Sequence, residues 1–211
     1  MSQSKLRELI LQKIRHVASP NAPLVSEMAY TSAQIYKPIL PDAIRCFQNE
    51  LEAVSGKCIL VENETQLFES LQNELVARNL HQVFCRDTAI SDKLTAFEIP
   101  YTNQSEDFDL MTCGITSCEY LVARTGSVLI SSSGYSGRQM VAFPPVHFVI
   151  AHSNQLVAYL DDALIALRQK YSANFPSQIT TITGPSRTAD IEKTLVLGAH
   201  GPKELIVFIV K

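Results

Sequence analysis

The sequence predicts a single α/β domain in which helices cover a mostly parallel sheet. Short apolar runs of strand length recur along the chain, and amphipathic segments of helical length separate them. Strands that are buried on both faces contain continuous apolar runs rather than alternating ones. Because strands and helices alternate in this way, the parallel sheet is expected to be covered on both faces.

The first 40 residues are predicted to form a helix and loop arm, separate from an α/β domain over residues 41–211. Residues 3–17 place Leu6, Leu9, Ile10 and Ile14 on one helical face. The prolines at 20 and 23 then break this pattern, and the stretch up to residue 40 is loop-like.

From residue 41 onward, each element is predicted from local signals. Pro41 suits the first turn of a helix, and Gly56 ends it after residue 54. Thr116 and Glu119 form a capping-box pattern that predicts a helix to residue 124. The remaining predicted helices are 65–79, 87–96, a long helix from residue 153 and 188–197; the predicted strands are 58–61, 81–85, 109–114, 127–132, 146–151, 178–183 and 204–210.

Composition and charge narrow the function classes. Hydrophobic residues make up 46% of the 211 residues and charged residues 18%, which is typical of a globular chain. A formal net charge of −3 argues against nucleic-acid binding through a general basic surface. No run approaches the roughly 18 apolar residues of a membrane span. The first ten residues lack the apolar segment of a signal peptide, so a cytoplasmic location is expected.

The five cysteines lie at positions 46, 58, 85, 113 and 118, without any CxxC spacing. Scattered buried thiols are favoured over a metal or iron–sulfur site, which requires closely spaced thiolates. We therefore expect no metal, no cofactor and no redox centre in this chain.

The segment 182–190 is the strongest candidate for a binding loop. Gly184 permits close backbone approach, Ser186 and Thr188 offer hydroxyls, and Arg187 offers a planar cation suited to carboxylate or phosphate. The predicted helix from residue 188 would add free N–H groups at the carboxyl edge of the sheet, where such folds bind ligands. A capped helix with Arg187 paired to Asp190 or another carboxylate is the alternative.

Three further polar residues are weaker candidates. His200 lies in a Gly-Ala-His-Gly-Pro turn and could be a ligand, an acid–base group or a backbone-bonded turn residue. Because this turn follows a predicted helix, it is expected at the opposite end of the sheet from residues 184–188. Arg138 could contact an anion from the loop 133–138 or be solvated. His147 could face the site, although a hydrogen-bonded position in the core is favoured.

Several catalytic signatures are missing from the sequence. It contains no GxxxxGK[ST], GxGxxG, GxSxG or HExxH pattern. The residues therefore assign no catalytic group, and whether the chain is an enzyme stays open.

Four motifs occur in order in the C-terminal half: Thr125-Gly126 before a strand, Arg138 followed by PPVH at 144–147, GPSRTADIE at 184–192 and GAHGP at 198–202. This combination resembles the LutC/YkgG family, the LUD domain of lactate utilization. The resemblance implies a three-layer αβα fold of the NagB/RpiA/CoA-transferase-like group. It also implies that Thr125 and Gly126 belong to the site.

The resemblance further implies a lactate-oxidising system with two iron–sulfur partners, LutA-like and LutB-like proteins. One position departs from the family pattern, since Arg124 stands where family members usually have glutamate before Thr-Gly. Arg124 either alters the ligand or stabilises a helix end through its charge; we expect it to be exposed near such an end.

Two functional hypotheses follow. The favoured one is a non-redox accessory subunit of an iron–sulfur L-lactate oxidation system, with a site for a small carboxylate or phosphate. The alternative is a stand-alone enzyme acting on a phosphorylated or acyl substrate. The alternative requires a catalytic carboxylate or nucleophile near residue 184 or 133.

The cysteine spacing generates a prediction about metal content. Protein purified anaerobically should be colourless and contain neither stoichiometric iron nor flavin, because cluster spacing and a dinucleotide loop are both missing. Elemental analysis checks this, and one or more equivalents of iron per chain would contradict it.

Overall fold

The computed structural model describes residues 3–17, 38–104, 110–134, 138–172, 174–188, 196–198 and 200–211. The chain divides into two units, Met1–Pro38 and Ile39–Lys211. The first unit contains helix α1 (Gln3–Val17), as its apolar periodicity predicts. The described residues include no helix that is both long and apolar enough to cross a membrane.

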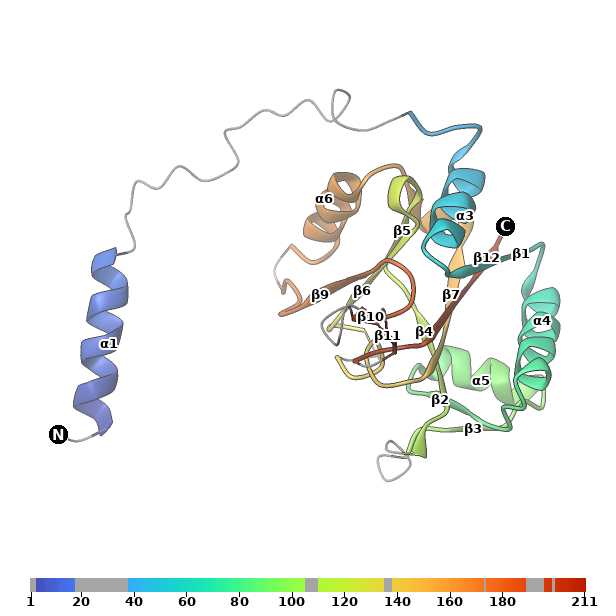
Figure 1. Cartoon of the computed structure of the whole chain (residues 1–211), viewed down its shortest axis with the longest axis horizontal. Helices are drawn as coiled ribbons and strands as arrows, with labels where there is room; N and C mark the ends of the chain where they lie inside the picture. The colour runs from blue at the N-terminus through green and yellow to red at the C-terminus, as the bar shows by residue number, and fades with distance from the viewer. Residues whose placement is uncertain are drawn as a thin grey trace. The chain divides into compact units, whose positions relative to one another are not determined.

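The second unit is built around a six-stranded sheet, the main sheet, in which every neighbouring pair of strands is parallel (Figure 1). This confirms the predicted parallel α/β fold. The strands lie in the order β1 (Lys57–Val61), β12 (Glu204–Val210), β7 (Val146–His152), β4 (Cys113–Ser117), β2 (Val83–Cys85) and β3 (Tyr101–Thr102).

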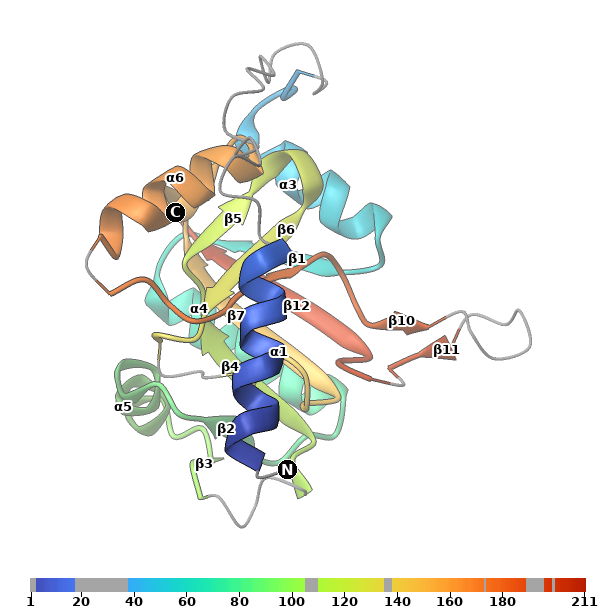
Figure 2. The same ribbon diagram turned by 90° about the vertical axis from the view of Figure 1, so that its left-hand side faces the viewer.

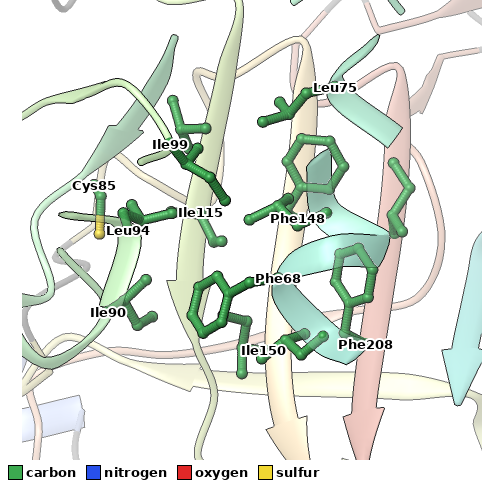
Figure 3. Close-up of a cluster of buried hydrophobic side chains, with 14 of the residues drawn as sticks. Phe68, Leu75, Cys85, Ile90, Leu94, Ile99, Ile115, Phe148, Ile150 and Phe208 are labelled. Atoms are coloured by element: carbon green, nitrogen blue, oxygen red, sulfur yellow. The ribbon is translucent and has the colours of Figure 1, made fainter. Parts of the chain in front are cut away.

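Helices α4 (Glu64–Ala77) and α5 (Thr88–Ala96) cover one face of the main sheet. Asn63 and Asp87 begin these helices, because each side chain accepts hydrogen bonds from backbone N–H groups of the first turn. The core beneath them includes Phe148 and Phe208 on adjacent strands, with ring centroids 6.1 Å apart (Figure 3). Burying each of these rings contributes about 2 kcal/mol or more.

The opposite face of the main sheet is covered by helix α3 (Ala43–Ala53) together with a second, four-stranded sheet. Helix α6 (Leu160–Lys170) packs on the far side of that sheet (Figure 2). The second sheet has the order β8 (Leu156–Val157), β5 (Tyr120–Val122), β6 (Ser127–Ser131) and β9 (Ile179–Ile182). Strand β6 runs antiparallel to both β5 and β9, and the sequence did not predict this sheet.

Three predicted helices differ from the structure in the described residues, and the first two are the following. The segment predicted as a helix over 116–124 contains the end of β4, strand β5 and only a 3-10 turn, η3 (Ala123–Thr125). Its apolar residues pair with β6, and this tertiary pairing overrides the local capping signal. The helix predicted from residue 153 instead begins at Leu160, after the 3-10 turn η4 (Ser153–Gln155) and β8.

The helix predicted over 188–197 is also wrong at both ends. Strand β10 (Arg187–Thr188) pairs antiparallel with β11 (Val196–Leu197). Residues 189–195 lie outside the described residues. The strand predicted at 109–114 is displaced, since β4 begins at Cys113.

Gly126 allows the second sheet to approach helix α3 closely. Its φ of 59° is left-handed, and a Cβ atom there would lie 2.2 Å from the backbone N of Leu51. A side chain at this position would therefore be strained and would also push α3 away.

We predict that Gly126→Ala lowers the free energy of unfolding by about 2 kcal/mol or more, because the strained φ and the overlap with α3 both act against folding. Gly134→Ala is the matched control, since a Cβ there would meet nothing closer than the Ser131 carbonyl oxygen at 3.8 Å. Urea unfolding measures both variants. Equal free energies of unfolding for Gly126→Ala and Gly134→Ala would contradict the close approach of Gly126 to helix α3.

Candidate functional site

Two of the cavities in the second unit lie at opposite edges of the main sheet. One is lined by residues that come just before β7 and β12, so it lies at the amino ends of those strands. The other is lined by residues at the carboxyl ends of β2 and β4. They are called here the amino-edge cavity and the carboxyl-edge cavity.

The amino-edge cavity has a volume of about 400 Å³ and contains motif residues from the C-terminal half. His200 and Lys203 supply its polar side chains, and no carboxylate is among its described lining residues. The remaining lining residues are Ala142, Phe143, Pro145, Gly198 and Gly201.

The loop at 184–188 lies against this cavity. The N–H of Ser186 donates to the Pro202 carbonyl at 2.8 Å, and the Gly198 N–H donates to the Ser186 carbonyl at 2.9 Å. A Cβ on Gly201 would lie 2.9 Å from the Cβ of Ser186. The structure therefore brings the GPSRT and GAHGP motifs together.

The expectation that these two motifs lie at opposite ends of the sheet is wrong. The strand before the GPSRT motif, β9, belongs to the second sheet and not to the parallel main sheet. Its end therefore does not mark the carboxyl edge of the main sheet. The motif instead packs near the start of β1, where a Cβ on Gly184 would lie 2.6 Å from the Val54 carbonyl oxygen.

Arg187 contacts the end of helix α3. Its Nη2 donates to the Val54 carbonyl oxygen, and also to Ser55 Oγ at 2.9 Å. A cation beside the last carbonyls of a helix is stabilised by the helix dipole. Arg187 thus fastens the loop to α3, while Asp190, its suggested partner, lies outside the described residues.

Thr125 and Gly126 lie near the same helix rather than among the lining residues of either cavity. Thr125 Oγ1 accepts from Ser127 Oγ at 2.7 Å, and Ser127 Oγ contacts Thr183 Oγ1 at 2.7 Å. Arg124 is partly buried in an ion pair with Glu50 on α3. This corrects the expected exposed position of Arg124 and gives it a structural role between α3 and η3.

The two remaining candidates lie in different surroundings. Arg138 is exposed, and its Nη2 donates to Ser177 Oγ at 2.8 Å. His147 is fully buried, and its Nε2 is 2.9 Å from Thr116 Oγ1. Burial lowers the His147 pKa to about 4, so the ring is neutral at physiological pH. His147 therefore occupies the core position that the sequence favoured.

The carboxyl-edge cavity has a volume of about 310 Å³ and contains two buried carboxylates. Asp87 lies two residues after the end of β2, and Ser117 ends the neighbouring strand β4. Ser117 Oγ donates to Asp87 Oδ2 at 2.8 Å, while Asp87 Oδ1 accepts from the N–H groups of Ala89 and Ile90.

Glu119 is the second buried carboxylate of this cavity. It accepts hydrogen bonds from Ser131 Oγ at 2.5 Å, Tyr171 OH at 2.6 Å and Lys170 Nζ at 2.8 Å. Burial alone would raise the Glu119 pKa, but the hydrogen bonds from Lys170, Ser131 and Tyr171 outweigh it and lower the net value. The hydrogen bond to Glu119 raises the pKa of Lys170, so the pair is ionised at neutral pH.

Comparison with known proteins identifies the chain. The LUD domain family model matches residues 3–210. The chain belongs to the LUD domain family. It is 34% identical over 169 residues to lactate utilization protein C of Halalkalibacterium halodurans, covering 79% of this chain and 68% of that protein.

Other relatives of the LUD domain agree with this assignment. A protein of Neisseria meningitidis serogroup B is 28% identical over 184 residues, covering 87% of this chain and 73% of that protein. The match to lactate utilization protein C of Bacillus licheniformis is 34% identical over 46% of this chain and spans only 42% of that relative's length. A Deinococcus radiodurans DUF162 family protein has the same fold, with a TM-score of 0.61 and 16% identity over 80% of this chain and 96% of that one.

Sequence reasoning missed the carboxyl-edge cavity of the LUD domain. Glu119 was interpreted as a helix-capping residue, and the sequence assigned no role to Lys170 or Tyr171. One signal was present, because Asp87 lies two residues after a predicted buried strand and so belongs at the carboxyl edge. No spacing rule joins Glu119 to Lys170, which is 51 residues away.

The described residues contain no group of three or more His, Cys, Asp or Glu side chains that could hold a metal ion. All five cysteines are free. Burial raises the pKa of Cys58, Cys85 and Cys113 to about 12, so these thiols are protonated. They contribute to the core as small apolar groups.

The buried His147 leads to a pH-dependent prediction. Its folded-state pKa of about 4 lies below the ordinary value near 6.5, so the unfolded chain binds the proton more tightly. The stability associated with neutral His147 is therefore present above pH 6.5 and is lost as pH falls from 6.5 to 4. His147→Gln, which can still bond Thr116, should show a smaller loss across this interval.

Urea unfolding at pH 7, 5.5 and 4 compares the two proteins. As the pH falls, the free energy of unfolding should decrease more for the wild type than for His147→Gln. Parallel pH profiles would show that His147 is protonated at its usual pKa and would contradict a neutral core position.

Proposed function

We propose that this LUD domain is a non-redox accessory component of a lactate-utilization system and that it binds a small carboxylate in the amino-edge cavity. The names of several relatives, lactate utilization protein C, support the system. One observation supports an anionic ligand. His200 and Lys203 both line the amino-edge cavity, and its described lining contains no carboxylate.

The electrostatics of the amino-edge cavity favour an anion. A small carboxylate could accept charge-assisted hydrogen bonds from Lys203 without meeting a negative group in the described lining. Glu204, the next residue along the chain, is paired to Arg78 on the α4 side, with 2.8 Å between Arg78 Nε and Glu204 Oε2. Its charge is thus largely neutralised.

The loops around the cavity support its shape. Ser186 bonds to both sides of the 198–202 turn, and Arg187 fastens the same loop to α3. In this proposal Gly184, Ser186, Arg187 and Thr188 hold the site, and His200 and Lys203 supply its polar contacts. The apolar side chains of Ala142 and Phe143 suit the methyl group of a three-carbon acid.

The proposed partners are the iron–sulfur proteins of such a system, LutA-like and LutB-like proteins, which would carry the electrons. The lack of CxxC spacing among the five cysteines supports a chain without a cluster of its own. The alternative of a stand-alone acyl or phosphoryl enzyme requires a catalytic carboxylate or nucleophile near residue 184 or 133. The described lining of the amino-edge cavity contains no carboxylate, whereas Asp87 and Glu119 line the carboxyl-edge cavity together with Gly134.

We predict that L-lactate or pyruvate binds this protein and that Lys203→Met weakens binding by about tenfold or more, because one charge-assisted contact is lost. Methionine keeps the aliphatic chain, which matters because the Lys203 side chain lies over Gly198. Isothermal titration calorimetry with L-lactate, pyruvate and inorganic phosphate measures the effect.

Lys93→Met is the matched control, since Lys93 is a half-exposed lysine paired to Glu64 on α4, away from the described cavity lining. It should leave the affinity unchanged. Arg187→Ala should weaken binding while the protein still folds, because the loop loses its contact with α3. If no small anion binds, or if Lys203→Met binds as tightly as wild type, the amino-edge site is wrong.

A further inference from the structure

The carboxyl-edge cavity has no role in the proposed function, yet its wall is built from ionised and buried groups. Asp87 and Glu119 are only 7% and 9% exposed. Buried charges are costly unless they are paired and hydrogen-bonded, and here both carboxylates also border an open cavity, although Asp87 caps helix α5 as well. The cavity also lies beyond the carboxyl ends of β2 and β4, where parallel sheets bind ligands.

Both carboxylates keep hydrogen-bonding capacity on one oxygen. Glu119 Oε1 accepts from Ser131 and Tyr171, whereas Oε2 accepts from Lys170. Asp87 shows the same asymmetry, with two N–H groups on Oδ1 and Ser117 Oγ on Oδ2. A carboxylate oxygen can accept two hydrogen bonds, so among the described contacts Glu119 Oε2 and Asp87 Oδ2 can each accept one from a ligand.

Lys170 provides the donors of the same cavity. Its ammonium group has three N–H bonds, and Glu119 accepts one of them. The Lys170 side chain is 54% exposed, in contrast to its buried partner. It can therefore turn its other N–H groups toward a ligand carboxylate while it keeps Glu119 ionised.

The charge balance selects the ligand class. Two carboxylates and one ammonium leave the described lining residues with one net negative charge, so a simple anion such as a 2-hydroxy acid is disfavoured. A ligand with an ammonium group offsets that charge, and a carboxylate on the same ligand can pair with Lys170. Stacking of a sugar or base is not favoured, because Lys170 Nζ lies over the Tyr171 ring, 5.4 Å from its centroid.

We propose that the carboxyl-edge cavity is a binding site for a zwitterionic 2-amino acid. The ammonium group of the ligand donates to Asp87 and Glu119, and its carboxylate accepts from Lys170. Ala89 and Ile130 form the apolar part of the wall, and the volume of about 310 Å³ accommodates a ligand side chain. The amino-edge and carboxyl-edge cavities thus differ in charge, one suited to an anion and one to a zwitterion.

The test compares amino acids with hydroxy acids of the same carbon skeleton. L-alanine and L-lactate form one pair, and L-leucine and its 2-hydroxy analogue form another. Calorimetric titrations use the full chain carrying Lys203→Met, so that binding of an anion at the amino-edge cavity is weakened by about tenfold or more; a panel of the twenty standard amino acids precedes them. The best amino acid should bind at least tenfold more tightly than its hydroxy analogue, because only the ammonium group offsets the net negative charge.

Two substitutions then locate the site. Asp87→Asn keeps an acceptor for the first turn of α5 and removes the charge, and Lys170→Met removes the carboxylate partner. Each should lower affinity by about tenfold or more, whereas Lys93→Met should not change it. Circular dichroism confirms folding; if Lys170→Met does not fold, Asp87→Asn decides. The proposal is overturned if no amino acid binds, if the hydroxy analogue binds as tightly, or if the folded variants bind like the parent.

Discussion

The strands of the main sheet are apolar and must be buried on both faces. The way in which α3 and the second sheet cover one of these faces determines where much of the remaining chain lies. Helices α4 and α5 bury one face, as the alternating pattern of strands and helices predicts. The other face packs against α3 and strands β5 and β6 of the second sheet. Because the second sheet covers this face, residues 179–182 form an antiparallel edge strand of the second sheet and not a strand of the main sheet. The GPSRT motif, which follows this strand, consequently lies at the amino edge of the main sheet.

Covering the sheet in this way also separates the polar groups into two environments. The amino edge receives His200 and Lys203 from the connection that precedes β12. The carboxyl edge receives Asp87 from α5, Glu119 from the connection between β4 and β5, and Lys170 from the end of α6. Because the three charged groups of the carboxyl edge come from different elements, the charge of that cavity depends on tertiary packing, whereas His200 and Lys203 share one connection.

These arrangements explain which parts of the fold could be predicted from the sequence. Strands such as β12, whose residues are almost all buried, contain continuous apolar runs that are visible without a structure. The failures occur where a local signal competes with pairing between distant segments. Thr116 and Glu119 satisfy a capping pattern, but residues 120–122 pair with β6, and the carboxylate of Glu119 is held by Lys170 instead. Single-sequence patterns describe neighbours along the chain, and this contact joins residues 51 apart.

Several glycines and arginines of the motifs pack against helix α3 and position the backbone there. A residue can therefore belong to a motif of this domain without contacting a ligand. Gly126 and Gly184 both approach the last two turns of α3, where a Cβ atom would overlap backbone atoms of Leu51 or Val54. Arg187 bonds to the same end of the helix, and Arg124 pairs with Glu50 on it. Since these contacts converge on α3, the helix acts as the anchor for the connections on either side of the second sheet. An arginine at position 124 fits this arrangement because Glu50 is its partner, whereas a glutamate there would face Glu50 and repel it.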